Sequence, residues 1–208
     1  MLQIKTIESG TFSLLIDLME IDELNSFSLV GGTALALRFG HRISVDIDLF
    51  SNQRFDVLNL VSVLESRFGS DFSYLHQHNT SCIFCYIRDV KVDIVYYPHR
   101  LISPIVTTHK VRMYNDPDIA AMKIQAILGR GKKKDFWDLN QLLKNYTLGQ
   151  IIDWHKQKFP NQMLAISIPH ALTYFVDADE SEDPHCLNGY TWEEIKIAIK
   201  KVVRDFLR

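Results

Sequence analysis

Several features that would assign this chain to a familiar class are scarce or missing. Three cysteines among 208 residues, no secretory leader pattern and no apolar run long enough to span a bilayer favour a reducing, cytoplasmic setting without a membrane partner. The formal net charge of −2 provides no overall positive field for nucleic acid. No Gly-Lys-Ser/Thr follows the paired glycines, and the spaced glycines of a dinucleotide fingerprint are missing, which excludes a Walker loop and a Rossmann motif.

The cysteines also give little support to a metal or redox site. Cys82 and Cys85 form a C-x-x-C in the β-branched and aromatic run SCIFCYI. On a strand, a spacing of three places the two sulfurs on opposite faces. With no second pair downstream, we predict buried strand cysteines and no zinc centre or disulfide.

Residues 30–50, VGGTALALRFGHRISVDIDLF, carry the most chemistry. The pattern predicts a short strand at 27–30, a glycine turn, a helix that ends at Gly40, and a second strand. Consecutive glycines allow backbone conformations that are closed to other residues, and a helix N-terminus attracts anions. A phosphate site at this turn would use Gly31, Gly32 and Thr33.

The strand that follows the helix carries two acids, Asp46 and Asp48. Because strand side chains alternate, both carboxylates are expected on one face, with the opposite face formed by Val45, Ile47 and Leu49. Two neighbouring carboxylates repel each other unless a cation lies between them. A hard divalent ion such as Mg²⁺ is the usual partner for such oxygens.

A third acid lies further along the chain. Residues 72–77, 81–87 and 90–97 are predicted to be strands, the last two joined as a hairpin. Asp93 lies in the third of these strands, with Lys91 on the same face. If this strand pairs beside the first acidic strand, Asp93 completes a three-carboxylate cluster. The alternative is an edge-strand aspartate that points into water.

Proline-containing turns between residues 98 and 117 predict a domain boundary near residue 115. The remainder is predicted to be helical, with two helices at 118–143 separated by a break at Gly129 and Gly131, and further helices at 148–159, 162–175 and 192–207. Five basic residues in the connection either help to hold an RNA backbone or are simply solvated: His99, Arg100, His109, Lys110 and Arg112.

The first helical segment of the second half contains further charged candidates. Lys123 lies among apolar positions and either reaches the surface or points into a cleft, where its ammonium would suit a triphosphate. Asp135 and Asp138 are one helical turn apart and share a face. Arg130 and Lys134 either neutralise transferred phosphate or form solvent-exposed ion pairs.

Four ordered motifs carry a resemblance to a known family. They are GGTALALRFGHRISVDIDLF, VKVDIVYY, DIAAMKIQAILGRGKKKDFWDL and ALTYFVDADE. Together they resemble the AbiEii-type nucleotidyltransferase toxin family, within the DNA polymerase β-like nucleotidyltransferase superfamily. The resemblance implies an α+β fold with a small mixed sheet, made of a catalytic domain at 1–114 and a helical C-terminal domain at 115–208 that completes the cleft.

The same resemblance implies the activity and the partners. The expected reaction is Mg²⁺-dependent transfer of a nucleoside monophosphate from an NTP to an acceptor, and the expected acceptor is tRNA. The expected context is a bacterial toxin-antitoxin or abortive-infection system with a winged-helix antitoxin protein. Two Mg²⁺ ions would be held by Asp46, Asp48 and Asp93. Asp135 would join these three as a catalytic residue, and the nucleotide would contact Gly31, Gly32, Thr33, Lys123, Arg130 and Lys134.

Other functions are compatible with the same motifs. A small-molecule nucleotidyltransferase acting on an aminoglycoside-like acceptor, or one acting on protein, would share the three acids. A catalytically silent binding module would keep the fold without the chemistry, although the intact acids argue against it.

Overall fold

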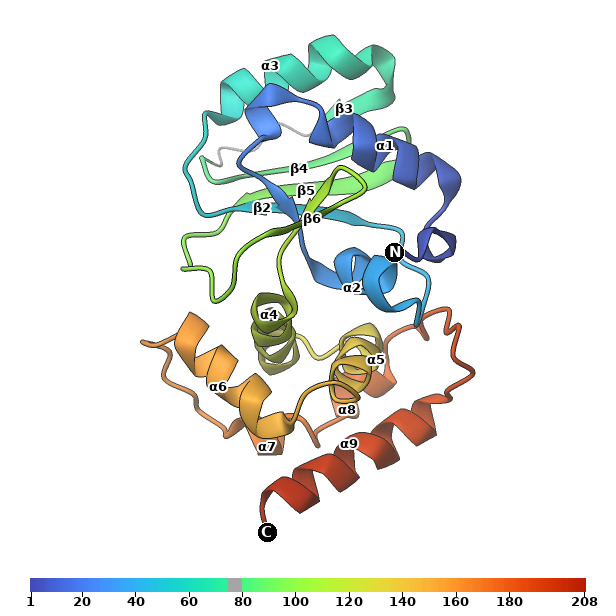
Figure 1. Cartoon of the computed structure of the whole chain (residues 1–208), viewed down its shortest axis with the longest axis vertical. Coiled ribbons are helices and arrows are strands. Elements are labelled where there is room, and N and C mark those ends of the chain that lie inside the picture. The colour runs from blue at the N-terminus through green and yellow to red at the C-terminus, as the bar shows by residue number, and fades with distance from the viewer. Residues whose placement is uncertain (75–79) are drawn as a thin grey trace. The chain divides into compact units, whose positions relative to one another are not determined.

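The computed structural model describes residues 1–74 and 80–208 (Figure 1). Its α-helices are α1 (Ser9–Met19), α2 (Gly31–Phe39), α3 (Val57–Phe68), α4 (Asp116–Gly129), α5 (Lys133–Leu142), α6 (Leu148–Lys158), α7 (Ile168–Ala171), α8 (Val176–Asp179) and α9 (Trp192–Phe206). Its strands are β1 (Ser28–Leu29), β2 (Ile47–Ser51), β3 (Phe72–Tyr74), β4 (Cys82–Ile87), β5 (Val90–Tyr96), β6 (Val106–Thr108) and β7 (Val111–Met113). Short 3-10 helices lie at Ile4–Thr6, Asp22–Leu24 and Gly69–Asp71. This succession confirms the predicted α+β class.

The strands of the described residues form one seven-stranded sheet in the order β3-β4-β5-β2-β1-β7-β6. β2 pairs with β5 in parallel, as does β1 with β7, and the other neighbours are antiparallel. The predicted mixed sheet is therefore confirmed. Because β5 and β1 flank β2, the acidic strand lies inside the sheet and not at its edge.

The chain is organised as two compact units. The first, which we call the sheet unit, comprises Met1–Arg38, Ser44–Arg100 and Ile105–Tyr114 and contains all seven strands of the described residues. The second, the helical unit, comprises Phe39–Ile43, Leu101–Pro104 and Asn115–Arg208. Each unit has its own apolar core, because buried residues occur throughout both.

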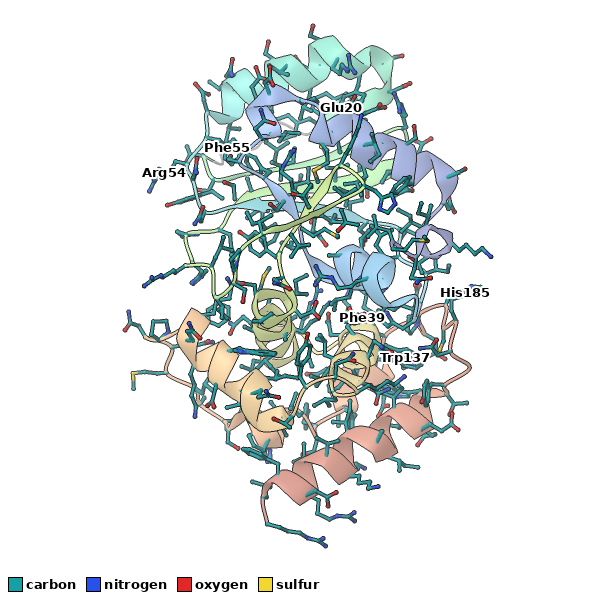
Figure 2. The ribbon with its side chains drawn as sticks, viewed as in Figure 1. Glu20, Phe39, Arg54, Phe55, Trp137 and His185 are labelled. Atoms are coloured by element: carbon teal, nitrogen blue, oxygen red, sulfur yellow. The ribbon has the colours of Figure 1, made fainter. Side chains whose placement is uncertain are left out.

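The core of the sheet unit follows from the period-two pattern of its strands. In β2, Ile47 and Leu49 are buried and Asp48 is half-buried. Helix α3 packs against β3 and β4, and α1 packs against β7, so the helices cover the apolar face. The rings of Phe27 and Phe55 meet edge to face with centroids 5.1 Å apart, close to the other side chains of this core (Figure 2). The polar face of the strands is therefore left to the carboxylates.

The helical unit is built around α4, which packs against both α5 and α6. Trp137 of α5 stacks on Trp192 of α9 with ring centroids 5.5 Å apart (Figure 2). A capping box starts α9, since Thr191 and Glu194 exchange hydrogen bonds with each other's backbone. Aromatic packing and capping thus fix the last helix on α5.

The strand expected at 72–77 is confirmed as β3 over 72–74, and its last residues, 75–77, lie outside the described residues. The helix expected at 162–175 is wrong, because only α7 forms within that span. Met163 and Ile166 are 97% and 46% exposed there, and apolar side chains without a packing partner gain little from helix formation.

No helix in the described part of the chain is both long enough and apolar enough to cross a bilayer.

Cys82 and Cys85 are buried, unbridged residues of β4, as predicted. Burial and the nearby Asp93 carboxylate raise the pKa of Cys82 and raise that of Cys85 to about 12. The third cysteine, Cys186, is only partly buried.

We expect a thiol reagent at neutral pH to modify Cys186 first and Cys82 and Cys85 at least about 100-fold more slowly, because buried thiols with raised pKa values hold little thiolate. Stopped-flow thiol titration with peptide mapping measures both rates, and the denatured chain, in which all three thiols should react alike, is the control. Fast paired modification of Cys82 and Cys85 would contradict this assignment.

Candidate active site

Asp48 and Asp93 lie side by side on neighbouring strands. β2 and β5 pair in parallel with Asp48 opposite Asp93, and paired strands are about 4.8 Å apart. Asp46 directly precedes β2. The sequence predicted a three-carboxylate cluster only if the Asp93 strand pairs with the first acidic strand. The pairing of β5 with β2 meets this condition. We call Asp46, Asp48 and Asp93 the carboxylate row.

The predicted alternation fails at one position. Val45 was expected on the apolar face with Ile47 and Leu49, but it is 56% exposed, whereas Ile47 and Leu49 are 0% and 1% exposed. The regular strand begins only at Ile47, so its pleat does not extend back to Val45.

Lys91 provides positive charge to the carboxylate row. Its Nζ lies 2.6 Å from Asp93 Oδ2. Burial lowers the pKa of Lys91, but the hydrogen bond to Asp93 and the negative charges of Asp93, Asp46 and Asp48 outweigh burial, so the pKa is raised. The three carboxylates therefore act on one small region, and that region favours a cation.

The carboxylate row fits Mg²⁺. Within the described residues, Asp93 Oδ1 is buried and makes no hydrogen bond, a state that calls for a missing partner. The same residues hold no ready-made cluster of three metal-ligating side chains. Mg²⁺ is usually held by one or two carboxylates together with substrate phosphates, so an all-protein cage is not required. The carboxylate oxygens of this row are hard donors, which suit this ion.

Gly31 brings the glycine turn directly against the carboxylate row. Its φ of +69° lies in the left-handed region that favours glycine. A Cβ at this position would lie 2.6 Å from Asp48 Oδ2, so any side chain would collide with the carboxylate. The N-terminus of α2 and Asp48 therefore share one small volume, where a phosphate and its metal ion would meet.

Thr33 links the helix to the acidic segment. It is 1% exposed, its hydroxyl hydrogen-bonds the Asp46 carbonyl, and the hydroxyl lies 2.9 Å from Ser44 Oγ. This bonding fixes the backbone of Asp46 relative to α2. A phosphate contact of Thr33 stays a prediction, and its backbone N–H in the first turn of the helix is the group suited to it.

Two of the five basic residues in the connection have structural roles. Arg112 donates hydrogen bonds to the backbone carbonyls of Met19, Leu24 and Phe27, each at 3.0 Å. Lys110 Nζ lies 2.9 Å from the Glu20 carboxylate. For this pair the structure favours internal bonding over an RNA contact.

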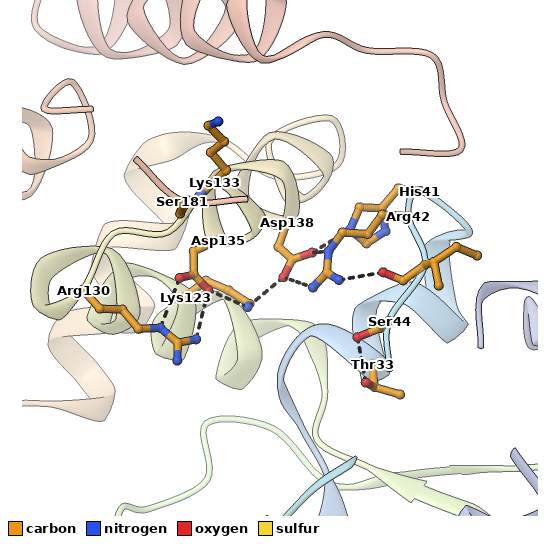
Figure 3. A network of polar contacts seen from close by, with 11 residues as sticks. Thr33, His41, Arg42, Ser44, Lys123, Arg130, Lys133, Asp135, Asp138 and Ser181 are labelled. Carbon is orange, nitrogen blue, oxygen red and sulfur yellow. Dashed lines mark hydrogen bonds and ion pairs between the residues drawn. The ribbon is translucent and has the colours of Figure 1, made fainter. Parts of the chain in front are cut away.

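A buried ion cluster occupies the helical unit (Figure 3). Its centre is Asp138, which is 0% exposed and lies 2.7 Å from each of three nitrogens: His41 Nε2, Arg42 Nε and Lys123 Nζ. Burial raises the pKa of Asp138, but Arg42, Lys123 and the hydrogen bonds from His41 and Arg42 outweigh burial and hold the pKa well below its usual range. Asp138 is therefore an anchor for the short segment that carries His41 and Arg42.

Lys123 extends this cluster to Asp135. Its Nζ lies 3.0 Å from Asp135 Oδ1, and Arg130 Nε lies 3.3 Å from Asp135 Oδ2. Burial lowers the pKa of Lys123, but Asp138 and Asp135 outweigh it and raise the pKa. Lys123 is 5% exposed and does not reach the surface, whereas the Arg130 side chain is 55% exposed. Of these cations, Arg130 is the one with room to contact a ligand.

His41 and Arg42 are the residues that sequence reasoning missed. They follow the glycine that ends α2 and precede the acidic segment, and we had assigned them no role. The signal was a histidine next to an arginine in a very short connection between two predicted elements. An arginine in so confined a place requires an acidic partner, and Asp138 is that partner.

The fold agrees with the comparisons to known proteins. The family model described as "Nucleotidyl transferase AbiEii toxin, Type IV TA system" matches residues 13–163. This chain belongs to the AbiEii nucleotidyltransferase toxin family. It is also 34% identical over 191 residues to the uncharacterized protein aq_aa25 of Aquifex aeolicus (strain VF5), with 88% of this chain and 89% of that protein covered. The resemblance read from the motifs is confirmed, and the protein is a nucleotidyltransferase.

Solved structures show the same fold as this AbiEii-family enzyme. MenT4, a nucleotidyltransferase toxin from Mycobacterium tuberculosis H37Rv, superposes with a TM-score of 0.59 at 15% identity, covering 95% of this chain and 86% of that one. JHP933 from Helicobacter pylori superposes with a TM-score of 0.52 at 15% identity, covering 95% and 92%. The polymerase β-like fold expected from the motifs is therefore confirmed.

The contact between Gly31 and Asp48 can be tested against Gly69, a second glycine at positive φ that has no close neighbour. Gly31→Ala and Gly69→Ala both place alanine at positive φ, and a Cβ at Gly69 meets nothing within 4 Å. Both should lose about 1 kcal/mol of unfolding free energy. Only Gly31→Ala should lower nucleotidyl transfer, by roughly 100-fold, because its Cβ would displace the Asp48 carboxylate, which we expect to act in the reaction. Urea denaturation and initial rates measure the two effects, and equal rates in both variants would contradict this account.

Neutralising the centre of the buried ion cluster should be costly. Asp138→Asn leaves Arg42 and Lys123 buried with less negative charge, so we expect a loss of about 3 to 5 kcal/mol of unfolding free energy. Asp153→Asn, at a side chain that is 78% exposed and 3.8 Å from Lys156, should cost less than about 1 kcal/mol. Chemical denaturation of both variants compares them directly.

The pH dependence of the unfolding free energy that this cluster contributes follows from the direction in which each pKa is shifted. The folded pKa values of Asp135 and Asp138 are lowered, so their contribution is present above the unfolded value of about 3.9 and is lost as the pH falls through the folded values. The pKa of Lys123 is raised, so its contribution is full below about 10.4 and is lost as the pH rises through the folded value. The difference between wild type and Asp138→Asn should therefore shrink as the pH falls below about 4, and a difference that stays constant down to acid unfolding would contradict it.

Proposed function

We propose that this enzyme transfers a nucleoside monophosphate from an NTP to an acceptor hydroxyl with the help of Mg²⁺. In this reaction the acceptor oxygen forms a bond to the α-phosphorus, and the bond from that phosphorus to the bridging oxygen of the β-phosphate breaks. Pyrophosphate leaves, and the proton of the acceptor hydroxyl passes to a carboxylate. The observation that supports this most directly is the register that sets Asp48 opposite Asp93, with Gly31 against Asp48.

The residues of the carboxylate row have distinct roles in this proposal. Asp46, Asp48 and Asp93 hold the metal, and two bound Mg²⁺ ions would supply Lewis-acid stabilisation of the charge on the reacting phosphate. Asp93 accepts the proton of the acceptor hydroxyl through Oδ1, the oxygen that makes no hydrogen bond within the described residues. Lys91 holds the other oxygen and orients the carboxylate. Positioning and electrostatics provide most of the rate.

The triphosphate is assigned to the glycine turn. Backbone N–H groups of Gly31, Gly32 and Thr33 in the first turn of α2 face no intrahelical partner and favour anions. For the helical unit we propose the roles that the family resemblance implies: Asp135 assists catalysis, and Lys123, Arg130 and Lys134 contact the nucleotide. The exposure of Arg130 supports its role most directly, whereas the buried Lys123 acts through the carboxylates that it bonds.

The biological setting is proposed from the family. The acceptor is tRNA, the enzyme works in the cytoplasm as the toxin of a bacterial toxin-antitoxin or abortive-infection system, and a winged-helix antitoxin is its protein partner. Membership of a family described as a type IV toxin supports this setting. Growth arrest on induced expression, relieved by a co-expressed antitoxin, is the corresponding cellular observation.

The reaction is tested by incubating the purified protein with each α-³²P-labelled NTP, Mg²⁺ and total cellular RNA. We expect label in the tRNA band. Asp48→Ala, Asp46→Ala and Asp93→Asn should each reduce it at least about 100-fold, because each removes a group that acts in the transition state. Omission of Mg²⁺ should have the same effect.

The matched control is Asp71→Asn, an acid of the same unit whose side chain is 56% exposed. It should retain wild-type transfer, and all four variants should unfold at similar denaturant concentrations. Transfer by a folded variant of the carboxylate row would contradict the metal assignment. Label on protein or on a small molecule would support nucleotidyl transfer but contradict tRNA as the acceptor.

A further inference from the structure

The carboxylate row has two different flanks in the sheet unit. In the strand order, β1 and Gly31 lie beside β2, while β4 lies beyond β5. The first flank carries the glycine turn and the N-terminus of α2. The second flank carries two aromatic residues: Phe84 pairs directly opposite Asp93, and Tyr86 pairs opposite Lys91. Directly opposed residues of paired strands share a face, so both rings belong to the carboxylate face.

Phe84 and Tyr86 are unusually exposed for an interior strand. They are 43% and 53% exposed, whereas Ile83, Cys85 and Ile87 at the alternate positions are buried. In the part of the chain that the structure describes, neither ring stacks on another aromatic side chain or meets a cation. Aromatic residues favour strands in general, but that preference does not explain why two of them stand unburied beside the reacting acids.

In-line displacement decides which flank each substrate uses. The attacking and leaving oxygens lie on opposite sides of the transferred phosphorus. The proposed function, on which this inference rests, assigns the leaving pyrophosphate to the glycine turn on the β1 flank. The attacking hydroxyl must then arrive from the β4 flank, past Asp93. The part of the acceptor that carries this hydroxyl therefore lies over β4.

We propose that Phe84 and Tyr86 form a stacking platform for the terminal base of a polynucleotide acceptor. The backbones of Phe84 and Asp93 are one strand spacing apart, roughly 4.8 Å, so a base stacked on Phe84 places its ribose hydroxyl within reach of that carboxylate. Every base has a flat face that stacks on aromatic rings, so such a platform holds an RNA end without a sequence requirement. Lys91, 43% exposed at its side chain, lies opposite Tyr86 and can meet the backbone phosphate. An aminoglycoside or a protein hydroxyl offers no comparable pair of flat faces.

A direct test uses a short single-stranded RNA that ends in 2-aminopurine, whose fluorescence falls when the base stacks. The full chain is titrated with this RNA in Mg²⁺ without NTP, so the readout does not require transfer. We expect quenching by the wild type, and binding weakened roughly 5- to 150-fold in Phe84→Leu and in Tyr86→Leu, as for loss of one stacked base. Leucine keeps an apolar side chain on the strand and isolates the aromatic face.

Two control variants complete the design. Phe84→Tyr should bind and quench as the wild type does, since it keeps the ring. Tyr174→Leu, at a tyrosine of the helical unit that is 49% exposed, should also leave binding unchanged. In the transfer assay, Phe84→Leu should raise the KM for RNA while leaving the KM for NTP as it is.

The outcomes separate this inference from the proposed function. No quenching by the wild type, or equal binding by the leucine variants, would overturn the platform even if nucleotidyl transfer occurs. Transfer to protein or a small molecule, with no RNA bound, would overturn it and leave the reaction standing. Ring-dependent quenching without any transfer would support the platform and count against the proposed reaction.

Discussion

The parallel pairing of β2 with β5 is the constraint on which the site depends. It places two carboxylates, Asp48 and Asp93, directly opposite each other, where like charges destabilise a sheet. Two neighbouring residues make this arrangement possible. Lys91 bonds one oxygen of Asp93, and Gly31 leaves no side chain between the backbone and Asp48. A site that keeps so much negative charge together is stabilised when it binds a cation, which is the chemistry of phosphoryl transfer.

The buried ion cluster and the carboxylate row differ in how completely their carboxylates are hydrogen-bonded, and this difference indicates their roles. Asp138 is fully buried and bonded by the side chains of His41, Arg42 and Lys123, so its charge is satisfied within the helical unit. Asp93 is partly exposed, and within the described residues one of its oxygens makes no hydrogen bond. A fully satisfied buried network fixes backbone geometry. An incompletely satisfied carboxylate at an open face is available for a ligand.

Much of the site could be predicted because it is encoded in local periodicity. Alternation identified the acidic strand and the Asp93 strand, and the paired glycines located the turn, since both signals depend only on neighbouring residues. The helix expected at 162–175 is wrong because its formation depends on contacts outside the local sequence. Tertiary packing supplies most of the stability of a short helix, and Met163 in this span is 97% exposed.

The acids of the carboxylate row, the glycine turn, the mixed α+β class and the family can all be predicted from contiguous motifs, because the spacing within a motif has direct geometric consequences. The order of the strands, and therefore the position of Asp93 opposite Asp48, follows from the tertiary structure alone. The tertiary structure also brings Asp138 to His41 and Arg42, which are almost a hundred positions away in the sequence and hydrogen-bond its carboxylate. Pairings of this kind depend on long-range burial and charge compensation, which no local pattern records.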